Sequence, residues 1–178
     1  MVKNRYQIRL SSIDDSERYS RYYRKNQSHL SPWEQKRPEG YHDVAAWRER
    51  LMEYEALRED DRAYHFNLKR DKDDAISGVC SISGIIRSPF EACYMSCSVS
   101  FDCEGKGMAQ HLCRHVIDFA FDHLKLHRIM ANHMPANKRS KRLLHRLGFE
   151  REGFAKNYLK INGVWEDHVL TSLINNNF

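Results

Sequence analysis

Two glycines, Gly105 and Gly107, separate two stretches of the chain whose apolar residues recur with different periods. Before them, alternate apolar residues predict a strand with one buried face; after them, an apolar residue at every fourth position predicts an amphipathic helix. A glycine turn between a strand and a helix leaves backbone N–H groups and the positive end of the helix dipole directed at a ligand. The pattern therefore predicts a site for a phosphorylated or other anionic ligand. The alternating residues are Cys93, Met95, Cys97, Val99 and Phe101, and the helical ones are Met108, Leu112, Val116, Ala120 and Leu124.

The glycine pair does not identify the ligand, and a plain strand-to-helix turn that needs two flexible residues would have the same sequence. Gln110 stands where a dinucleotide-binding fingerprint has its third glycine, and the chain contains no G-x-x-x-x-G-K-[ST] motif. Neither a Rossmann site nor a phosphate-binding P-loop is supported.

Length and composition indicate an ordinary folded protein. We expect the 178 residues to form one domain, 1–178, with a substantial core, because 41% of them are hydrophobic and 30% are charged. No apolar run approaches the ~20 residues of a membrane span, and the first ten residues lack the apolar segment of a signal peptide. These features predict a cytoplasmic protein that does not associate with membranes.

The cysteines and histidines give no sign of a metal site. The five cysteines are odd in number and form no C-x-x-C pair, which favours reduced, mostly packed thiols. His111 and His115 lie one helical turn apart, but no cysteine or carboxylate completes a ligand set, so we expect no metal.

Basic residues are concentrated in one short segment. The chain has a net charge of +5 and a pI near 9.0, which suggests a polyanionic ligand or partner. A phosphate-rich ligand or RNA near this segment would explain the cluster, and so would a solvated helix face. Its members are Lys138, Arg139, Lys141, Arg142 and Arg146.

The remaining patterns predict an α/β fold with a mixed sheet. Helices are expected over 13–26, from just after Asp43, over 108–124, and from Asn137 as N-cap to Gly148 as C-terminal stop. A polar segment should follow the first helix at 26–31, and Asn162-Gly163 predicts a hairpin turn. Strands are expected over 6–10, 63–68, 75–86, 93–101, 127–134, 149–161 and 164–174.

This order of elements, with a G-x-G turn after the fourth strand, resembles the GNAT acyltransferases over essentially the whole chain. Further segments are similar to the ribosomal-protein N-acetyltransferases of the RimJ and RimL types, and especially to the RimJ type, which modifies an N-terminal alanine. The resemblance implies about seven strands flanked by four helices, and acetyl-CoA as the acetyl donor. The segments that carry it are 30–34, 127–132, 134–140, 147–153 and 162–168.

The resemblance also implies where acetyl-CoA binds. The family's pyrophosphate loop begins with Arg or Gln, and Asp102 occupies that position here, so Lys106 is expected to compensate. The pantetheine arm should follow the end of the preceding strand, and Arg139 or Arg142 should approach the adenosine phosphates. The expected cofactor-binding residues are Val99, Ser100, Phe101, Gly105, Lys106, Gly107, Met108, Ala109, Asn137 and Arg142.

For catalysis, the resemblance assigns an Asn-x-x-Ser motif, here Asn137 and Ser140. Ser140 would protonate the departing sulfur of CoA, Asn137 would fix the cofactor or a water, and a backbone N–H at 99–101 would polarise the thioester carbonyl. A capping asparagine followed by an ordinary serine is the alternative. The general base stays unassigned, because the family's two acidic positions hold Asn132 and, near the last hairpin, Leu159. His133 and Glu104 are further candidates.

A missing base favours an N-terminal amine as acceptor. At pH 7, removing a proton costs about 1 kcal/mol for an α-amine and about 4.6 kcal/mol for a lysine side chain. A water chain could meet the first cost but not readily the second. By analogy with the family, the acceptor enters between the loop at 31–40 and the final hairpin, where Trp33 and Tyr158 would line its groove. Either aromatic residue could instead be an ordinary packing residue.

Two other functions remain open at this point. A polyamine acetyltransferase of the same fold would need a cluster of carboxylates, which the second helix could offer. A non-enzymatic ribosome-assembly or RNA-binding factor would use the basic helix and bind RNA in a strongly salt-dependent way, although the chain contains no RNA-recognition motif. The candidate carboxylates are Glu53, Glu55, Glu59, Asp60 and Asp61.

Overall fold

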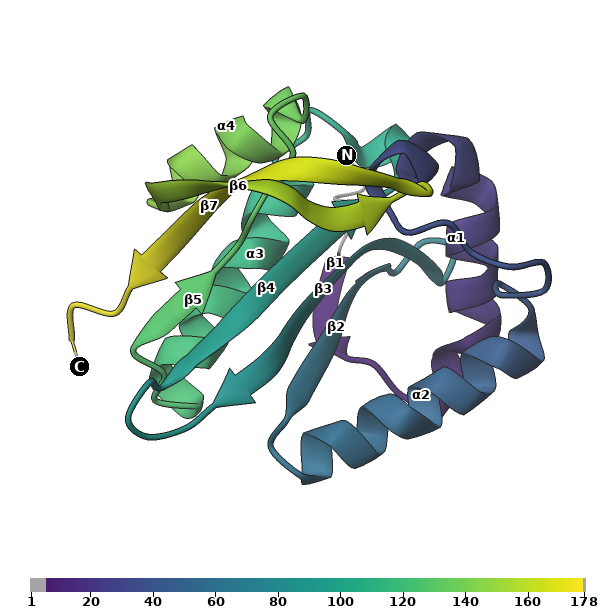
Figure 1. The fold of residues 1–178 in the computed structure, drawn as a ribbon. Coiled ribbons are helices and arrows are strands. Elements are labelled where there is room, and N and C mark those ends of the chain that lie inside the picture. The colour runs from purple at the N-terminus through teal and green to yellow at the C-terminus, as the bar shows by residue number, and fades with distance from the viewer. Residues whose placement is uncertain (1–5, 178) are drawn as a thin grey trace.

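A mixed sheet of seven strands forms the centre of the molecule in the computed structural model, which describes residues 6–177 (Figure 1). The strand order is β1-β2-β3-β4-β5-β7-β6, and among these pairs only β4 and β5 run parallel. The strands are β1 (Tyr6–Leu10), β2 (Ala63–Arg70), β3 (Ala75–Ile86), β4 (Ala92–Val99), β5 (Arg128–Met130), β6 (Glu150–Ile161) and β7 (Val164–Ile174).

The sheet opens between its two central strands. The parallel pairing of β4 and β5 covers three residues on each strand and ends at Tyr94 and Met130. Beyond that point the chain after β5 stays with β7, through the bridge between His133 and Val169. The predicted strand at 127–134 is therefore too long, because only Arg128–Met130 form a strand and the chain beyond them separates from β4. The second half of β4 consequently has β3 on one side and no strand on the other among the described residues.

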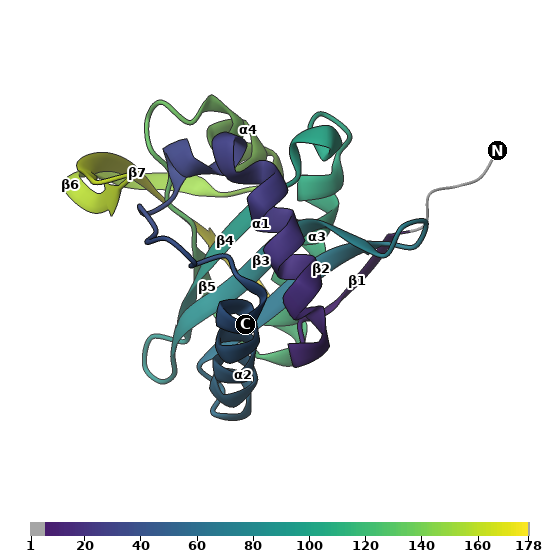
Figure 2. The ribbon, with the colours of Figure 1, turned by 90° about the vertical axis from the view of Figure 1, so that its right-hand side faces the viewer.

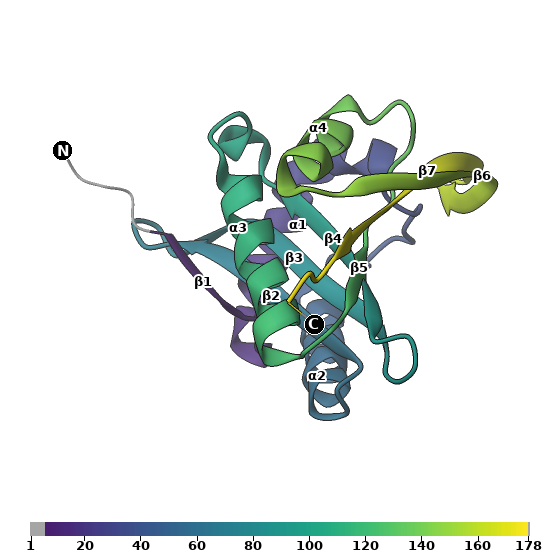
Figure 3. The ribbon, with the colours of Figure 1, turned by 90° about the vertical axis from the view of Figure 1, so that its left-hand side faces the viewer.

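Helices cover both faces of the sheet. The helices α1 (Ser16–Leu30) and α2 (Val44–Glu59) lie on one face, and α3 (Met108–Asp118) lies on the other (Figure 2; Figure 3). The helix α4 (Lys138–Leu147) packs beside α3, and its residues Leu144 and Leu147 join the same core. Short 3-10 turns, η1 (Ile13–Asp15), η2 (Ser31–Trp33) and η3 (Phe101–Cys103), and the π turn η4 (Phe119–His123) extend the helices or connect elements.

Two apolar cores hold these layers together. The stripe predicted for the third helix is confirmed, since Leu112, Val116, Ala120 and Leu124 are all buried against the sheet. A smaller aromatic core joins α1 and α2 on the other face. It consists of Tyr19, Tyr22, Leu30, Trp47, Leu51 and Ile76.

The end of the first helix differs from the prediction. The helix continues to Leu30 and does not give way to a polar segment at residue 26. Asn26 is 2% exposed; its amide donates to the Tyr22 carbonyl, and its Oδ1 accepts from the Ser100 hydroxyl and the Phe101 N–H. This polar residue therefore ties the helix to the end of β4 and does not end the helix. No helix of the described residues is long and apolar enough to cross a membrane.

Candidate active site

A cleft of about 900 Å³ lies where the sheet opens. Its walls are the end of α1 and the segment after it, the middle of β3, the second half of β4, the glycine turn with the start of α3, and one face of α4. Ile161, at the end of β6, closes one side. The cleft thus joins segments that lie far apart in the sequence.

The glycine turn supplies one end of the cleft with free backbone donors. Gly105 and Gly107 have φ values of +69° and +75°, which L side chains rarely adopt, and Gly107 is the N-cap of α3. The first N–H groups of an α-helix have no partner within the helix, and the helix dipole adds partial positive charge there. Met108 and Ala109 line the cleft beside both glycines. The glycine turn and helix start on which the predicted anion site depends are therefore present, and anion binding there stays a prediction.

The charges around this turn differ from the expectation. Asp102 pairs with Lys25 across 2.9 Å, and the proximity of Ser100 and Lys25 holds the pKa of its carboxyl well below the usual range. Lys106 does not line the cleft, because its Nζ donates to the Asp102 carbonyl at 2.6 Å. The acidic residue is thus neutralised by α1, and Lys106 braces the loop from outside the cleft.

The open edge of β4 lies two residues earlier than predicted. Ser100 N–H donates to Ser77 and Phe101 N–H donates to Asn26, so neither is free to hold pantetheine or a thioester oxygen. Phe101 is 68% exposed, and neither residue lines the cleft. Since alternate residues of an antiparallel strand point at the same neighbour, Cys97 and Val99 direct their N–H groups away from β3, into the opening.

The start of α4 forms the wall opposite the glycine turn. Asn137 is the N-cap, as predicted, because its Oδ1 accepts from the Ser140 N–H at 3.0 Å. Asn137, Ser140 and Arg142 all line the cleft. So does Arg146, one turn after Arg142, and neither guanidinium has a hydrogen bond or ion pair within residues 6–177. Arg139 also lines the cleft but pairs with Glu104.

The other end of the cleft is aromatic. Trp33 lines it, as predicted, but Tyr158 does not: its hydroxyl lies 3.4 Å from Asn132 Nδ2, and its ring contacts His168. The sequence analysis did not predict four further lining residues, Tyr19, Tyr23, Tyr54 and His65. In the sequence these residues look like ordinary packing residues of helices and strands, and no motif marks them as part of a site. Burial raises the pKa of Tyr23 and lowers the pKa of His65 to about 4, so both are uncharged at neutral pH.

Neither candidate for the base is free to act as one. His133 is 5% exposed, does not line the cleft, and has Nδ1 2.9 Å from the Met134 carbonyl. Glu104 lines the cleft, but its carboxylate is held by Arg139 and by His29 at 3.1 Å. A third carboxylate, Glu34, lines the cleft without such partners, and sequence reasoning named it only within a family segment.

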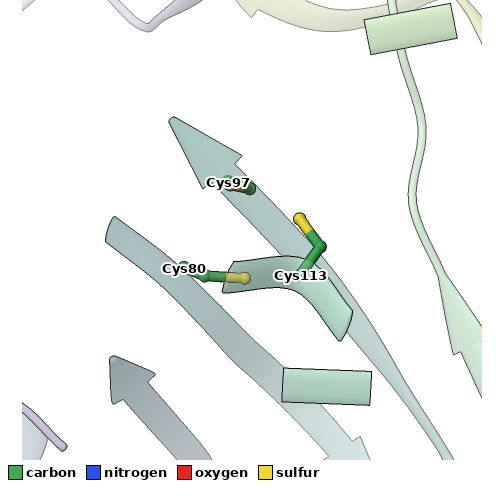
Figure 4. Close-up of side chains that lie close together, drawn as sticks. All are labelled: Cys80, Cys97 and Cys113. Atoms are coloured by element: carbon green, nitrogen blue, oxygen red, sulfur yellow. The ribbon is translucent and has the colours of Figure 1, made fainter. Parts of the chain in front are cut away.

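Three thiols meet at the wall of the cleft, which Cys80 and Cys97 line. The sulfur atoms of Cys80 on β3, Cys97 on β4 and Cys113 on α3 all lie within 4.8 Å of one another (Figure 4). Burial raises the pKa of the Cys80 thiol well above its ordinary value, which keeps it neutral. All five cysteines are free, and four are buried, which agrees with the predicted packed thiols.

The chain, with its open sheet edge beside a helix N-terminus, belongs to the GNAT acetyltransferase family. The family described as "Acetyltransferase (GNAT) domain" matches residues 5–150. The uS5-alanine N-acetyltransferase of Escherichia coli K12 is 39% identical over 173 residues, which cover 97% of this chain and 89% of that protein.

Solved structures agree with this membership. The ribosomal-protein-S5-alanine acetyltransferase of Vibrio fischeri superposes with a TM-score of 0.95 at 38% identity, covering 99% of this chain and 97% of that one. RimJ of Mycobacterium smegmatis, in complex with CoA-disulfide, has a TM-score of 0.90 at 26% identity, with 97% and 83% covered. The predicted family, mixed α/β fold and N-acetyltransferase class are confirmed.

Proposed function

We propose that this protein transfers the acetyl group of acetyl-CoA to the N-terminal amine of alanine on the small-subunit ribosomal protein uS5. The observation that carries the proposal is the 39% identity, across 97% of the chain, to a protein with that activity. The cleft is consistent with it, because it combines an anion site, an open strand edge and a separate aromatic end. Such a target implies that the enzyme works in the cytoplasm.

The residues of the cleft fit acetyl-CoA, which supplies the acetyl group as a thioester. The N–H groups that follow Gly105 and Gly107 bind the pyrophosphate. Cys97 and Val99 hold the pantetheine arm through the open edge of β4, in the manner of an added strand. Arg142, and with it Arg146, binds the remaining phosphate groups from α4.

Ser140 then serves the reaction at the far end of that arm. Asn137 caps α4 and so fixes the first helical turn, which carries the Ser140 hydroxyl into the cleft. The hydroxyl donates a proton to the sulfur as the carbon–sulfur bond breaks, and it regains a proton from the attacking amine. Asn137 therefore has the capping role and positions Ser140.

The carboxylates of the cleft favour a monoamine over a polyamine. Glu34 and Glu104 are the only acidic side chains in the described lining, and Glu104 is already paired. None of the acidic residues from 53 to 61 lines the cleft. Glu55, for example, accepts the Ile13 N–H at 3.0 Å. A polyamine would place several positive charges where one free carboxylate is available.

The basic helix favours a phosphorylated cofactor over RNA. Arg139, Arg142 and Arg146 line the cleft, whereas Lys138 and Lys141 do not. The three arginines therefore face the cofactor site and do not form one continuous outer surface with the lysines. Binding to the ribosomal subunit or its RNA would need a different face.

The release of CoA thiol from acetyl-CoA, measured against a panel of acceptors, tests the proposed function. The panel holds peptides that begin with alanine, serine or acetyl-alanine, a blocked peptide with one lysine, spermidine, and purified uS5. Acetylation of uS5 and of the free alanyl peptide is expected, with none of the acetyl-alanine peptide. Release with spermidine alone would refute the proposal, and so would faster acetylation of lysine than of the alanyl N-terminus.

A further inference from the structure

Glu34 occupies an unusual position in the cleft. Its side chain forms no hydrogen bond or ion pair within residues 6–177, although it lines a cavity and is half-buried. Even partial burial of a carboxylate without a partner is costly, because burial disfavours its charged form. The unpaired Glu34 carboxylate therefore lowers the stability of the free protein. This cost points to a ligand that supplies the missing hydrogen-bond or ion-pair partner.

The backbone around Glu34 is held firmly. The 3-10 turn at Ser31–Trp33 follows α1 directly and has Pro32 in its first turn, and the chain then becomes extended at Glu34. The Glu34 carbonyl accepts the N–H of Asn162, in the β6–β7 turn, at 2.8 Å. Two segments 128 positions apart therefore meet at this residue. The contact with the β6–β7 turn therefore fixes the backbone position from which the Glu34 side chain extends.

The surroundings of Glu34 are almost free of charge. Tyr22 and Tyr23 face it from α1, and burial raises both of their pKa values; His65 of β2 lines the same cavity with its pKa lowered to about 4. Arg37, on the same segment, is the nearby cation, and it opposes the effect of burial on Glu34. Burial prevails, so the pKa of Glu34 is raised above its ordinary value.

We propose that Glu34 and the aromatic side chains around it form the acceptor-amine site, in which the Glu34 carboxylate binds the N-terminal ammonium group and removes its proton. This inference rests on the proposed function and names the base that the family's own acidic positions do not supply. It also gives a chemical class of ligand, a single primary ammonium on a flexible chain end.

The step balances with the groups at hand. One proton passes from the ammonium nitrogen to the Glu34 carboxylate, which leaves a lone pair on the amine. The amine nitrogen bonds to the thioester carbon, the carbon–sulfur bond breaks, and the second amine proton reaches the departing sulfur through Ser140. Glu34 later returns its proton to water. The products are the amide, CoA thiol and one proton.

The test compares Glu34→Gln with the wild type over pH 6 to 9.5, using an alanyl peptide and acetyl-CoA. At pH 7 only about a tenth of an α-amine is neutral. We therefore expect Glu34→Gln to lower kcat/KM about 10- to 100-fold at pH 7. The deficit should shrink towards parity above pH 9, where the amine is already neutral. Acetyl-CoA binding, measured by calorimetry, should not change.

Two further variants separate chemistry from folding. Glu34→Asp keeps the carboxylate and should recover part of the activity. Glu39→Gln changes an exposed carboxylate five residues further along the same segment, outside the cleft, and should match the wild type. An unchanged pH profile in Glu34→Gln, or a loss of the same size at every pH, would overturn the inference.

Small primary amines are assayed as acceptors in parallel with the alanyl peptide. The proposed target and the proposed role of Glu34 can then be refuted independently of each other. Wild-type enzyme that ignores the alanyl peptide but acetylates small amines refutes the proposed target. The comparison of Glu34→Gln with wild type on those amines still decides whether Glu34 takes the proton.

Discussion

Replacing Gly107 by alanine isolates the contribution of the glycine turn to cofactor binding. An added Cβ at Gly107 would meet no atom within 4 Å, so the substitution causes no steric clash. The cost comes from the φ of +75°, and a left-handed conformation costs an L residue about 1–2 kcal/mol. For a chain of this length, that loss corresponds to a fall in Tm of about 2–8 °C.

Gly163 provides a matched control. Its φ is +88°, an added Cβ there also meets nothing within 4 Å, and it lies in the β6–β7 turn outside the cleft. Gly163→Ala should therefore lose a similar amount of stability. Only Gly107→Ala also moves the N–H groups at the start of α3 and places a methyl group in the space for the pyrophosphate.

Thermal unfolding and calorimetry with acetyl-CoA together test this reasoning. Both variants should unfold at lower temperature than the wild type, and only Gly107→Ala should weaken acetyl-CoA binding. We expect at least a tenfold rise in Kd, or about 1.4 kcal/mol. Equal Kd values for Gly107→Ala and wild type would show that the turn is not the phosphate site. An equal loss of acetyl-CoA affinity in Gly107→Ala and Gly163→Ala would show that the loss comes from reduced stability alone.

Three other predictions concern the cleft. Ser140→Ala should lower kcat about 10- to 100-fold and leave the KM for acetyl-CoA within about twofold, because the hydroxyl acts on the departing sulfur. Steady-state assays that show a changed KM with an unchanged kcat would contradict this prediction. Arg142→Ala should raise the Kd for acetyl-CoA about 10- to 100-fold, since charge-assisted bonds contribute about 1.5–3 kcal/mol. Arg114 is an exposed arginine outside the cleft, and Arg114→Ala should leave that Kd unchanged. Because burial lowers the pKa of His65 from 6.5 to about 4, the unfolded chain binds more protons between these values, so the free energy of unfolding should fall as pH drops from 6.5 towards 4. His65→Gln should flatten that dependence in urea titrations and the exposed His111→Gln should not; the opposite pattern would rule out His65 as its source.

Local features of the site were predictable from the sequence. The Asn137 cap, the stop at Gly148 and the turn at Asn162-Gly163 were all found where the sequence places them, since each depends on a few adjacent residues. The glycine turn followed by the amphipathic α3 was predicted for the same reason. These features predict an anion site, which stays a prediction, and with the family segments they predict an acetyltransferase, which the comparisons confirm.

The open edge of β4 was not predictable in this way. The alternating pattern runs on to Phe101, but the strand ends at Val99, because Asn26, 75 positions away, takes the Phe101 N–H. Similarly, a strand is predicted over 127–134, but pairing with β7 draws the chain after Met130 away from β4. The end of β4 at Val99 and the separation of the chain after Met130 from β4 both shape the cleft. Each depends on which distant residue forms a hydrogen bond with a backbone N–H or C=O group.

Sequence alone thus determined which elements form, because helix periodicity, caps and tight turns are local properties. Tertiary structure decided which side chains face the reaction. It placed Tyr158 outside the cleft, paired Glu104 with Arg139, and left the half-buried Glu34 side chain without a partner within residues 6–177, beside the β6–β7 turn. The physical reason is that burial and charge pairing depend on residues distant in the chain, and no local pattern records them.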